Sequence, residues 1–529
     1  MLEKLKSKYL TIIVCLASLT GGLWHNQFIY DGYHWGFIFS NSLEFINGKT
    51  PYREIFLEYG IVSVIINSLI LIVFNKNVYS IIALTCITYS LSLFFISNIV
   101  YKITQNKYYS VFSIVIIFIL YPWPTVPWPN FYSFFFTILF CLYCFNSKKI
   151  YSLLAGIFLA LAYLTLTTVY NYIIILFFLF VILSIGKIRN RNKLLNILIG
   201  FLSVVVIFFC YLGYNNLLDI WISYQKLPFI QQSVYTEGGN TMYTLLLRYT
   251  YFITIYPIKN FILEPQWTIY ALFFYSNILT IFFFIINIYN VKNLKFAEEI
   301  FIINLLILSL NVYAQVLGIE KLATSIALGS VSLVFIIFNL KKNDTKFVLF
   351  FIIIFTCLYS LIFTFNLESS KIAGLRTAHI KELINFKLKI KNDQLRYFKS
   401  QKWDNEKWIT LDKINNIQKE IKKKCDLNYG ANLTANSFFH SIIQNKKLQI
   451  IPFFDKTNGK VFRKLIEPNL INDIQSQINN DNIFLITSEN NQKMLNLNEY
   501  DIPIEIMTFN NKDKINNKSI YIYFPKNCF

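Results

Sequence analysis

Ionisable residues gather in the segment that follows the first apolar run of the chain. Asp31 comes directly after that run and is followed by Gly32. Loss of hydration near a membrane boundary would make this carboxylate a usable general base, and an aspartate there could equally ligate a divalent metal ion. A solvated loop acid or a helix N-cap is the structural alternative. Asp31 is therefore the first candidate for a catalytic residue.

His34 stands three residues after Asp31. A helix that started near Gly32 would place the two side chains next to each other, where His34 could contact a substrate or a metal ion. The structural alternative is an interfacial aromatic partner of Tyr33 and Trp35. The sequence leaves both possibilities open.

A second polar group follows a Pro-Tyr pair. It consists of Arg53, Glu54, Glu58 and Tyr59. Glu54 and Glu58 are four residues apart and would lie on one face of a helix, opposite Asp31. They are candidates for substrate binding, and the ordinary polar entry to an amphipathic helix is the alternative.

Two further loops carry candidate binding residues. The loop 122–130 holds four prolines and the residues Trp123, Trp128 and Asn130. Tryptophan faces stack well on sugar rings or isoprenoids, and anchoring at a membrane interface is the alternative. The loop 214–265 holds Lys226, Arg248 and Lys259, which are suitable partners for a lipid phosphate.

The elements that must position these residues are mostly apolar. The chain of 529 residues is 55% hydrophobic and 15% charged, with a mean hydropathy of +0.46. This composition is typical of a membrane protein. The net charge of +20 lies largely in short clusters between apolar runs, so we expect no nucleic-acid partner.

Eleven runs are candidates for transmembrane helices, because crossing the bilayer takes roughly 20 mostly apolar residues. They are residues 9–29, 78–101, 108–121, 131–145, 150–168, 169–186, 194–213, 266–290, 297–315, 322–340 and 347–365.

A twelfth apolar run, 55–74, decides the topology. If it lies along the outer face, nearly all lysine and arginine clusters fall inside, as the positive-inside rule requires. We therefore expect an interfacial or re-entrant helix there. The regions 30–77, 122–130 and 214–265 would then share the outer face, with the tail after about residue 366.

The sequence thus predicts a polytopic α-helical membrane protein with a transmembrane domain at 1–365 and an outer soluble α/β domain at 366–529. In this second domain, helical patterns near 375–398 and 411–424 precede strand-like runs at 450–454, 483–487, 502–509 and 519–524. Cys425 and Cys528 could pair in an oxidising compartment or stay as free thiols. A composition rich in Ile, Asn and Lys suggests a bacterial inner (plasma) membrane protein.

The segment 31–75 resembles the membrane-embedded C-type glycosyltransferases, which include the lipid A aminoarabinose transferases and the protein O-mannosyltransferases. The similarity rests on Asp31 after the first apolar run, on Asn47-Gly-Lys-Thr-Pro-Tyr-Arg-Glu54 and on Glu58-Tyr-Gly60. Alternating apolar runs and an outer C-terminal domain are also similar to that family.

The resemblance implies an inverting transfer of a sugar from a polyprenyl-phosphate carrier to a lipid, polysaccharide or protein acceptor. Asp31 would match the acid of the first loop, Arg53 and Glu54 the basic-acidic pair, and Arg248 an arginine that holds the carrier phosphate. The chain departs from the family where Asn130 stands in place of a second-loop acid. A different acceptor, chemistry without a metal ion or a loss of activity would each explain this change.

Two other classes of function are compatible with the sequence. A non-enzymatic protein of cell-envelope assembly would bind its partner through the tail, and a transporter would move a lipid-linked glycan. The apolar runs contain almost no ionisable residues, which argues against ion-coupled transport.

Overall fold

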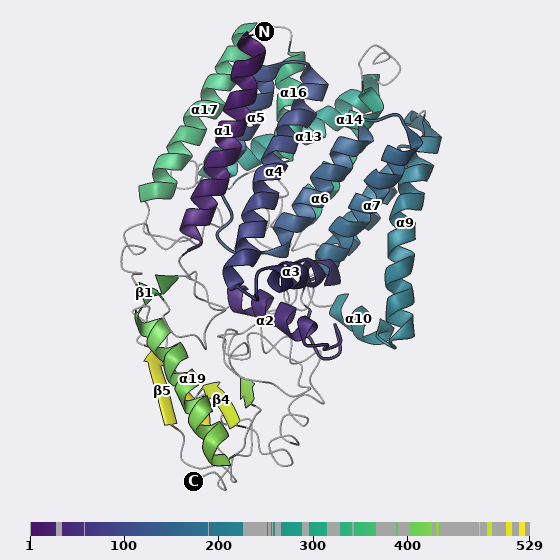
Figure 1. The fold of residues 1–529 in the computed structure, drawn as a ribbon. Helices are drawn as coiled ribbons and strands as arrows, with labels where there is room; N and C mark the ends of the chain where they lie inside the picture. The colour runs from purple at the N-terminus through teal and green to yellow at the C-terminus, as the bar shows by residue number, and fades with distance from the viewer. Residues whose placement is uncertain are drawn as a thin grey trace. The chain divides into compact units, whose positions relative to one another are not determined.

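The structure of the chain is a computed structural model (Figure 1). It describes residues 2–27, 34–57, 59–188, 190–225, 251, 255, 258–259, 266–287, 296–314, 328–340, 343–366, 388–389, 402–403, 405–425, 430–432, 476, 484–488, 504–509 and 518–523.

The described part of the chain is mostly helical, with fifteen α-helices. They are α1 (Leu2–His25), α2 (His34–Ile46), α3 (Ile61–Val73), α4 (Val78–Thr104), α5 (Lys107–Leu120), α6 (Pro129–Cys144), α7 (Lys149–Thr165), α8 (Thr167–Leu183), α9 (Arg191–Tyr214), α10 (Leu218–Gln225), α13 (Gln266–Asn287), α14 (Ala297–Ala314), α16 (Gly329–Asn339), α17 (Asn343–Asn366) and α19 (Asn405–Cys425).

The described part of each of the eleven long apolar runs is mainly on one helix, which confirms the helical state predicted for these residues. Two helices in the described residues, α4 and α9, are long and apolar enough to cross a membrane. Core helices of soluble proteins pass the same test, so these two do not by themselves assign the chain to a membrane.

The run 55–74 is helical only from Ile61 onward. Residues 51–57 form a turn instead, and Gly60 precedes the first helical residue in an extended conformation. The expectation that Glu54 shares a helix face with Glu58 is therefore wrong. The helix α2 lies in a region where the sequence analysis predicted no definite element.

The chain divides into two compact units. The first combines Met1–His25, Ala83–Asn215 and Asn240–His379, and the second combines Asn26–Ile82, Asn216–Gly239 and Ile380–Phe529. Each unit gathers segments that are distant in the sequence.

In the first unit, α7 and α9 approach each other closely at two glycines. A Cβ atom on Gly156 would lie 2.0 Å from the carbonyl oxygen of Ile197, and one on Gly200 would lie 2.1 Å from that of Leu153. Such distances are too short for any side chain, so both positions require glycine.

A polar network joins three other helices of the same unit. The amide of Asn277 on α13 donates to Oδ1 of Asn304 on α14 at 2.9 Å, and Ser332 on α16 donates to the same oxygen at 2.7 Å. All three residues are fully buried. Hydrogen bonds of this kind hold helices together where no charges are available.

The helices α6, α9 and α14 meet at an ion pair between the buried Lys193 and the half-buried Glu299. Nζ of Lys193 lies 2.6 Å from Oε1 of Glu299 and also donates to the carbonyl oxygen of Cys144. The backbone amide of Asn190 donates to Glu298 at 3.3 Å. The first turn of α14 thus receives hydrogen bonds from the N-terminal end of α9.

The tail contributes a four-stranded sheet with the order β3-β4-β6-β5. The strands are β3 (Gly430–Asn432), β4 (Phe484–Ser488), β5 (Ile504–Phe509) and β6 (Lys518–Tyr523), and only the β3–β4 pair is parallel. A separate two-stranded sheet joins β1 (Leu388–Lys389) to β2 (Lys402–Trp403).

The predicted helix at 411–424 is confirmed but begins six residues earlier, at Asn405, and the last three predicted strands are confirmed with shifts of one or two residues at their ends. The helix predicted at 375–398 is wrong at Leu388–Lys389, which form β1. The strand predicted at 450–454 and Cys528 lie outside the described residues.

Candidate functional site

The end of α2 is shaped by a glycine in the left-handed conformation. Gly48 has a φ of 85° and its amide donates to the carbonyl of Phe45, while the amide of Lys49 donates to that of Glu44 at 3.1 Å. These two bonds form a Schellman motif, which satisfies the last carbonyls of a helix. The motif brings Lys49 back over Glu44.

As a result, Glu44 and Lys49 form a largely buried ion pair that the sequence analysis missed. Their charged atoms lie 2.5 Å apart. Burial raises the pKa of the Glu44 carboxyl, the charge of Lys49 lowers it, and the charge of Glu54 raises it again. The signal in the sequence was an acid and a lysine on either side of Asn47-Gly48, a typical helix stop.

The chain then forms a tight turn at residues 50–57, which we name the Arg53 turn. The backbone amide of Thr50 donates to Oε2 of Glu54 at 2.8 Å, and the amide of Glu54 donates to the carbonyl of Thr50 at 2.9 Å. The carboxylate of Glu54 therefore stabilises the turn through a hydrogen bond inside it. This role is local and differs from the direct substrate contact predicted for Glu54.

Tyr52 is held in this turn with a φ of 68°, a conformation that is costly for a residue with a side chain. Its side chain is 1% exposed, and its ring packs edge-on against that of Tyr224 on α10 at 5.7 Å. The Tyr224 ring also lies 5.3 Å from that of Phe56, between ring centres. Aromatic packing against α10 thus stabilises the strained turn.

Arg53 follows Tyr52 and is exposed. Its Nη2 atom donates to the carbonyl oxygen of Asn216 at 3.2 Å, so the guanidinium is oriented by the backbone just before α10. Tyr59, a further candidate, is buried and packs against Phe37 at 6.1 Å between ring centres. Of the candidates in this segment, Arg53 is the one that the described structure presents to solvent.

The Pro-Trp loop belongs to the first unit, and its tryptophans make internal contacts. Nε1 of Trp123 donates to Nδ1 of His25 on α1 at 3.0 Å, and Trp123 remains partly exposed. Trp128 is 2% exposed and precedes α6, where Pro129 occupies the first position. Stacking on a sugar or an isoprenoid thus stays a prediction, with Trp123 as the more accessible ring.

Asn130, on the first turn of α6, is buried, and its Oδ1 atom has no hydrogen-bond partner among the residues that the structure describes. An acceptor left in this state costs about 1–3 kcal/mol. The Asn130 side chain therefore has the capacity to accept one further hydrogen bond.

The other candidates are described in part or not at all. Lys259 is helical and exposed. His34 is the first residue of α2, but its side chain lies outside the described part of the structure, as do Asp31, Glu58, Lys226 and Arg248. Within the described residues, no three His, Cys, Asp or Glu side chains are grouped so as to hold a metal ion.

Comparison with the models of known protein families and with curated protein sequences finds no match.

Proposed function

We propose that this protein is an integral membrane glycosyltransferase that moves a sugar from a polyprenyl-phosphate carrier to an acceptor at the outer face of the membrane. The observation that carries the proposal is the Arg53 turn. An exposed guanidinium on a strained, internally braced turn is a preorganised site for an anionic group. Backbone strain of this kind is concentrated at functional sites.

The membrane part of the proposal is supported by the distribution of side chains on the helices. On α9, the buried face includes Lys193 and Gly200, whereas Leu195, Ile199 and Val206 are exposed. On α3, Ser63, Asn67 and Ser68 are buried, whereas Leu69, Ile72 and Val73 are exposed. Exposed apolar faces of this extent favour contact with lipid rather than with water.

The chemical part starts from the phosphate of the carrier. A guanidinium presents its N–H groups in a planar fork that binds two phosphate oxygens at once. Arg53 would therefore bind the phosphate that leaves with the carrier, and Glu54 would hold the turn that presents Arg53.

In this mechanism Asp31 acts as the general base. It accepts the proton of the acceptor hydroxyl or amine, whose heteroatom attacks the anomeric carbon of the sugar. The bond from that carbon to the phosphate oxygen breaks, and the carrier phosphate keeps the electron pair.

Sugar transfer tests the chemistry. Purified Arg53→Lys and Asp31→Asn proteins are compared with the parent on a panel of polyprenyl-phosphate hexoses and pentoses, with lipid extracts as acceptors. We expect sugar transfer to be lost in Asp31→Asn, which lacks the general base. We expect it to be reduced in Arg53→Lys, because an ammonium cannot make the bidentate contact of a guanidinium with a phosphate. Lys148→Arg, at an exposed position before α7, is the matched control. Full activity of Asp31→Asn would overturn the assignment.

Topology is tested separately with a membrane-impermeant thiol reagent. Single cysteines are placed at Asn75, Ser147 and Ser488 in a chain that lacks its eight native cysteines. We expect labelling from outside at 75 and 488 but not at 147. Labelling at 147 but not at 488 would mean that the run 55–74 crosses the membrane.

A further inference from the structure

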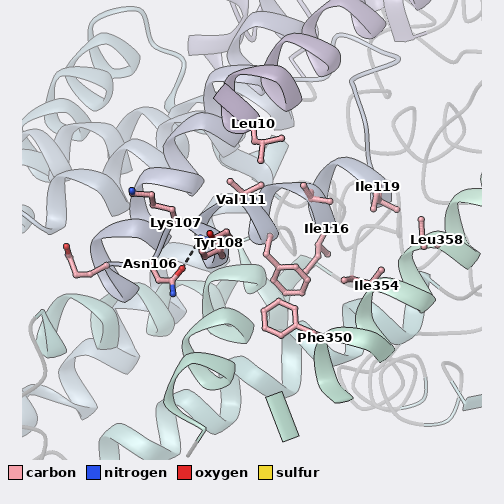
Figure 2. A pocket seen from close by; sticks show the side chains of 13 residues that line it. Leu10, Asn106, Lys107, Tyr108, Val111, Ile116, Ile119, Phe350, Ile354 and Leu358 are labelled. Atoms are coloured by element: carbon pink, nitrogen blue, oxygen red, sulfur yellow. Dashed lines mark hydrogen bonds between the residues drawn. The ribbon is translucent and has the colours of Figure 1, made fainter. Parts of the chain in front are cut away.

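An apolar groove runs along α5 between α1 and α17. Its volume is about 860 Å³. Figure 2 shows the apolar side chains that line it, among them Leu10 of α1, Ile119 of α5 and Phe350 and Ile354 of α17. Both α1 and α17 pack against α5, and Leu10 and Ile354 are about half exposed, so the groove is accessible from the side.

The length of the groove matches one leaflet of a bilayer. From Lys107 to Ile119 the lining follows α5 for about 18 Å, at about 1.5 Å per residue. Half of a hydrocarbon core about 30 Å thick is about 15 Å. An acyl chain of ordinary length would therefore fit along the groove.

The three helices run in the same direction past this groove. The rings of Phe112 and Phe350 lie 4.2 Å apart, and one helical turn further along, Ile116 and Ile353 belong to one buried cluster. The α5 and α17 helices are therefore parallel, and Leu10 places the beginning of α1 at the same end. Three helix N-termini at one end give it a positive potential.

Lysines reinforce that potential at the same end, which we name the lysine end. Lys107 lines the groove there with the polar residues Gln105 and Asn106. Figure 2 shows Lys107 and Asn106 at the end of the groove away from Ile119 and Leu358. Nζ of Lys346, on the first turn of α17, donates to the carbonyl of Phe338 at 3.2 Å, and the Phe338 ring packs on that of Tyr109. The first turns of α1 carry three more lysines: Lys4, Lys6 and Lys8.

We propose that this groove binds one anionic phospholipid, with its phosphate at the lysine end and an acyl chain along Val115 and Ile119. The charge of the lysine end selects for a negative headgroup, and the apolar lining accepts the chain. This inference depends on membrane insertion but not on sugar transfer. Its test measures lipid binding directly, so that its failure is distinct from a failure of the enzyme assignment.

The experiment is native mass spectrometry of the delipidated full chain in detergent. Dioleoyl phosphatidylglycerol and dioleoyl phosphatidylcholine are titrated separately, because they have the same chains and differ in headgroup charge. We expect one phosphatidylglycerol to bind more tightly than phosphatidylcholine. Lys107→Gln should lower the affinity for phosphatidylglycerol about fivefold. This corresponds to about 1 kcal/mol for one lysine near an anionic surface.

Two variants test the apolar part. Val115→Trp places an indole in the groove, and Leu358→Trp does so from α17 in case the first variant fails to fold. Each variant should abolish binding of the single high-affinity lipid, whereas Val206→Trp on the exposed face of α9 should leave this binding unchanged. Equal binding of the two lipids by the parent, or retention of phosphatidylglycerol in both groove variants, would overturn the proposal.

Discussion

The helices α3 and α19 differ in the side chains that they expose, although both bury apolar and polar residues together, such as Val64 and Asn67 on α3 and Ile414 and Asn415 on α19. On α3, the buried face contains Ser63, Asn67 and Ser68, and the exposed face contains Leu69 and Ile72. On α19, by contrast, the aliphatic Ile414 is buried, and the exposed residues include three lysines: Lys413, Lys423 and Lys424.

Under the proposed membrane location, the two helices lie in different solvents. α19 follows the rule for helices in water, with its charged residues outside. The exposed apolar side chains of α3 would cost little in lipid, whereas buried serine and asparagine need hydrogen-bonding partners. Ser68, for example, donates to the carbonyl of Ser42 on α2 at 3.0 Å. Burial of the polar side chains thus contributes to the packing of α3 on α2.

The largest effect is expected at the ion pair of Lys193 and Glu299. Lys193→Met leaves the half-buried Glu299 without its cation and should lower the free energy of unfolding by about 3 kcal/mol, the lower end of the range for buried pairs. Lys423→Met on α19 should change it by less than about 0.5 kcal/mol, because that lysine is exposed to solvent. Denaturation of the purified protein in detergent measures both variants. The double variant Lys193→Met/Glu299→Leu should recover most of the loss, and a small effect of Lys193→Met alone would contradict this ion pair.

A charge on the exposed face of α3 tests the contrast directly. Ile72→Arg should cost between about 1 and 3 kcal/mol if this face contacts lipid, since arginine is unfavourable in hydrocarbon. The matched variant Asn416→Arg on α19 should be nearly neutral. The fraction of each protein that integrates into membranes is the measurement. Equal integration of both variants would place the two helices in the same solvent.

Hydrogen bonds between helices should have a smaller effect. In a double-mutant cycle, Asn277→Ala and Asn304→Ala should couple by about 0.6 kcal/mol, with about 1.7 kcal/mol as the upper limit known for such pairs. Asn304→Ala combined with Thr20→Ala should show no coupling, because the Thr20 hydroxyl donates to Leu16 and Ala17 on its own helix α1. Thermal unfolding of the four proteins of each cycle gives the values. Coupling of equal size in both cycles would refute the network.

The smallest effect concerns pH. Burial raises the pKa of the Glu44 carboxyl in the folded protein, so the folded state binds more protons than the unfolded state above the ordinary glutamate pKa. Stability should therefore fall as the pH rises from about 4.3 through the raised pKa. Glu44→Gln should flatten this slope in a series of unfolding midpoints from acidic to neutral pH. Glu420→Gln, at an exposed position on α19, should leave the slope unchanged.

The helices were predictable from the sequence because long apolar runs between lysine clusters leave few other choices. The strands β4, β5 and β6 were predictable from alternating, β-branched segments. The Arg53 turn was not, because Ile55 and Leu57 continue the apolar run that leads into α3. The bonds between Thr50 and Glu54 belong to this turn, and the spacing of apolar residues in the sequence gives no sign of them.

The role of Arg53 stays a prediction, and the contacts around it could not be read from the sequence. The sequence analysis treated Glu54 as a substrate contact, whereas the structure gives its carboxylate a backbone partner at Thr50. It missed Glu44, because the pairing with Lys49 depends on the left-handed Gly48 and not on helical spacing. Contacts that depend on one backbone angle are difficult to predict from the sequence.

The glycine contact between α7 and α9 has a mechanical consequence. With backbone against backbone at Gly156 and Gly200, neither helix can rotate about its axis or slide past the other, since either motion would drive a side chain into a carbonyl. The pair therefore keeps its relative position, and the next break in the helical backbone is at Leu166, where α7 ends and α8 begins.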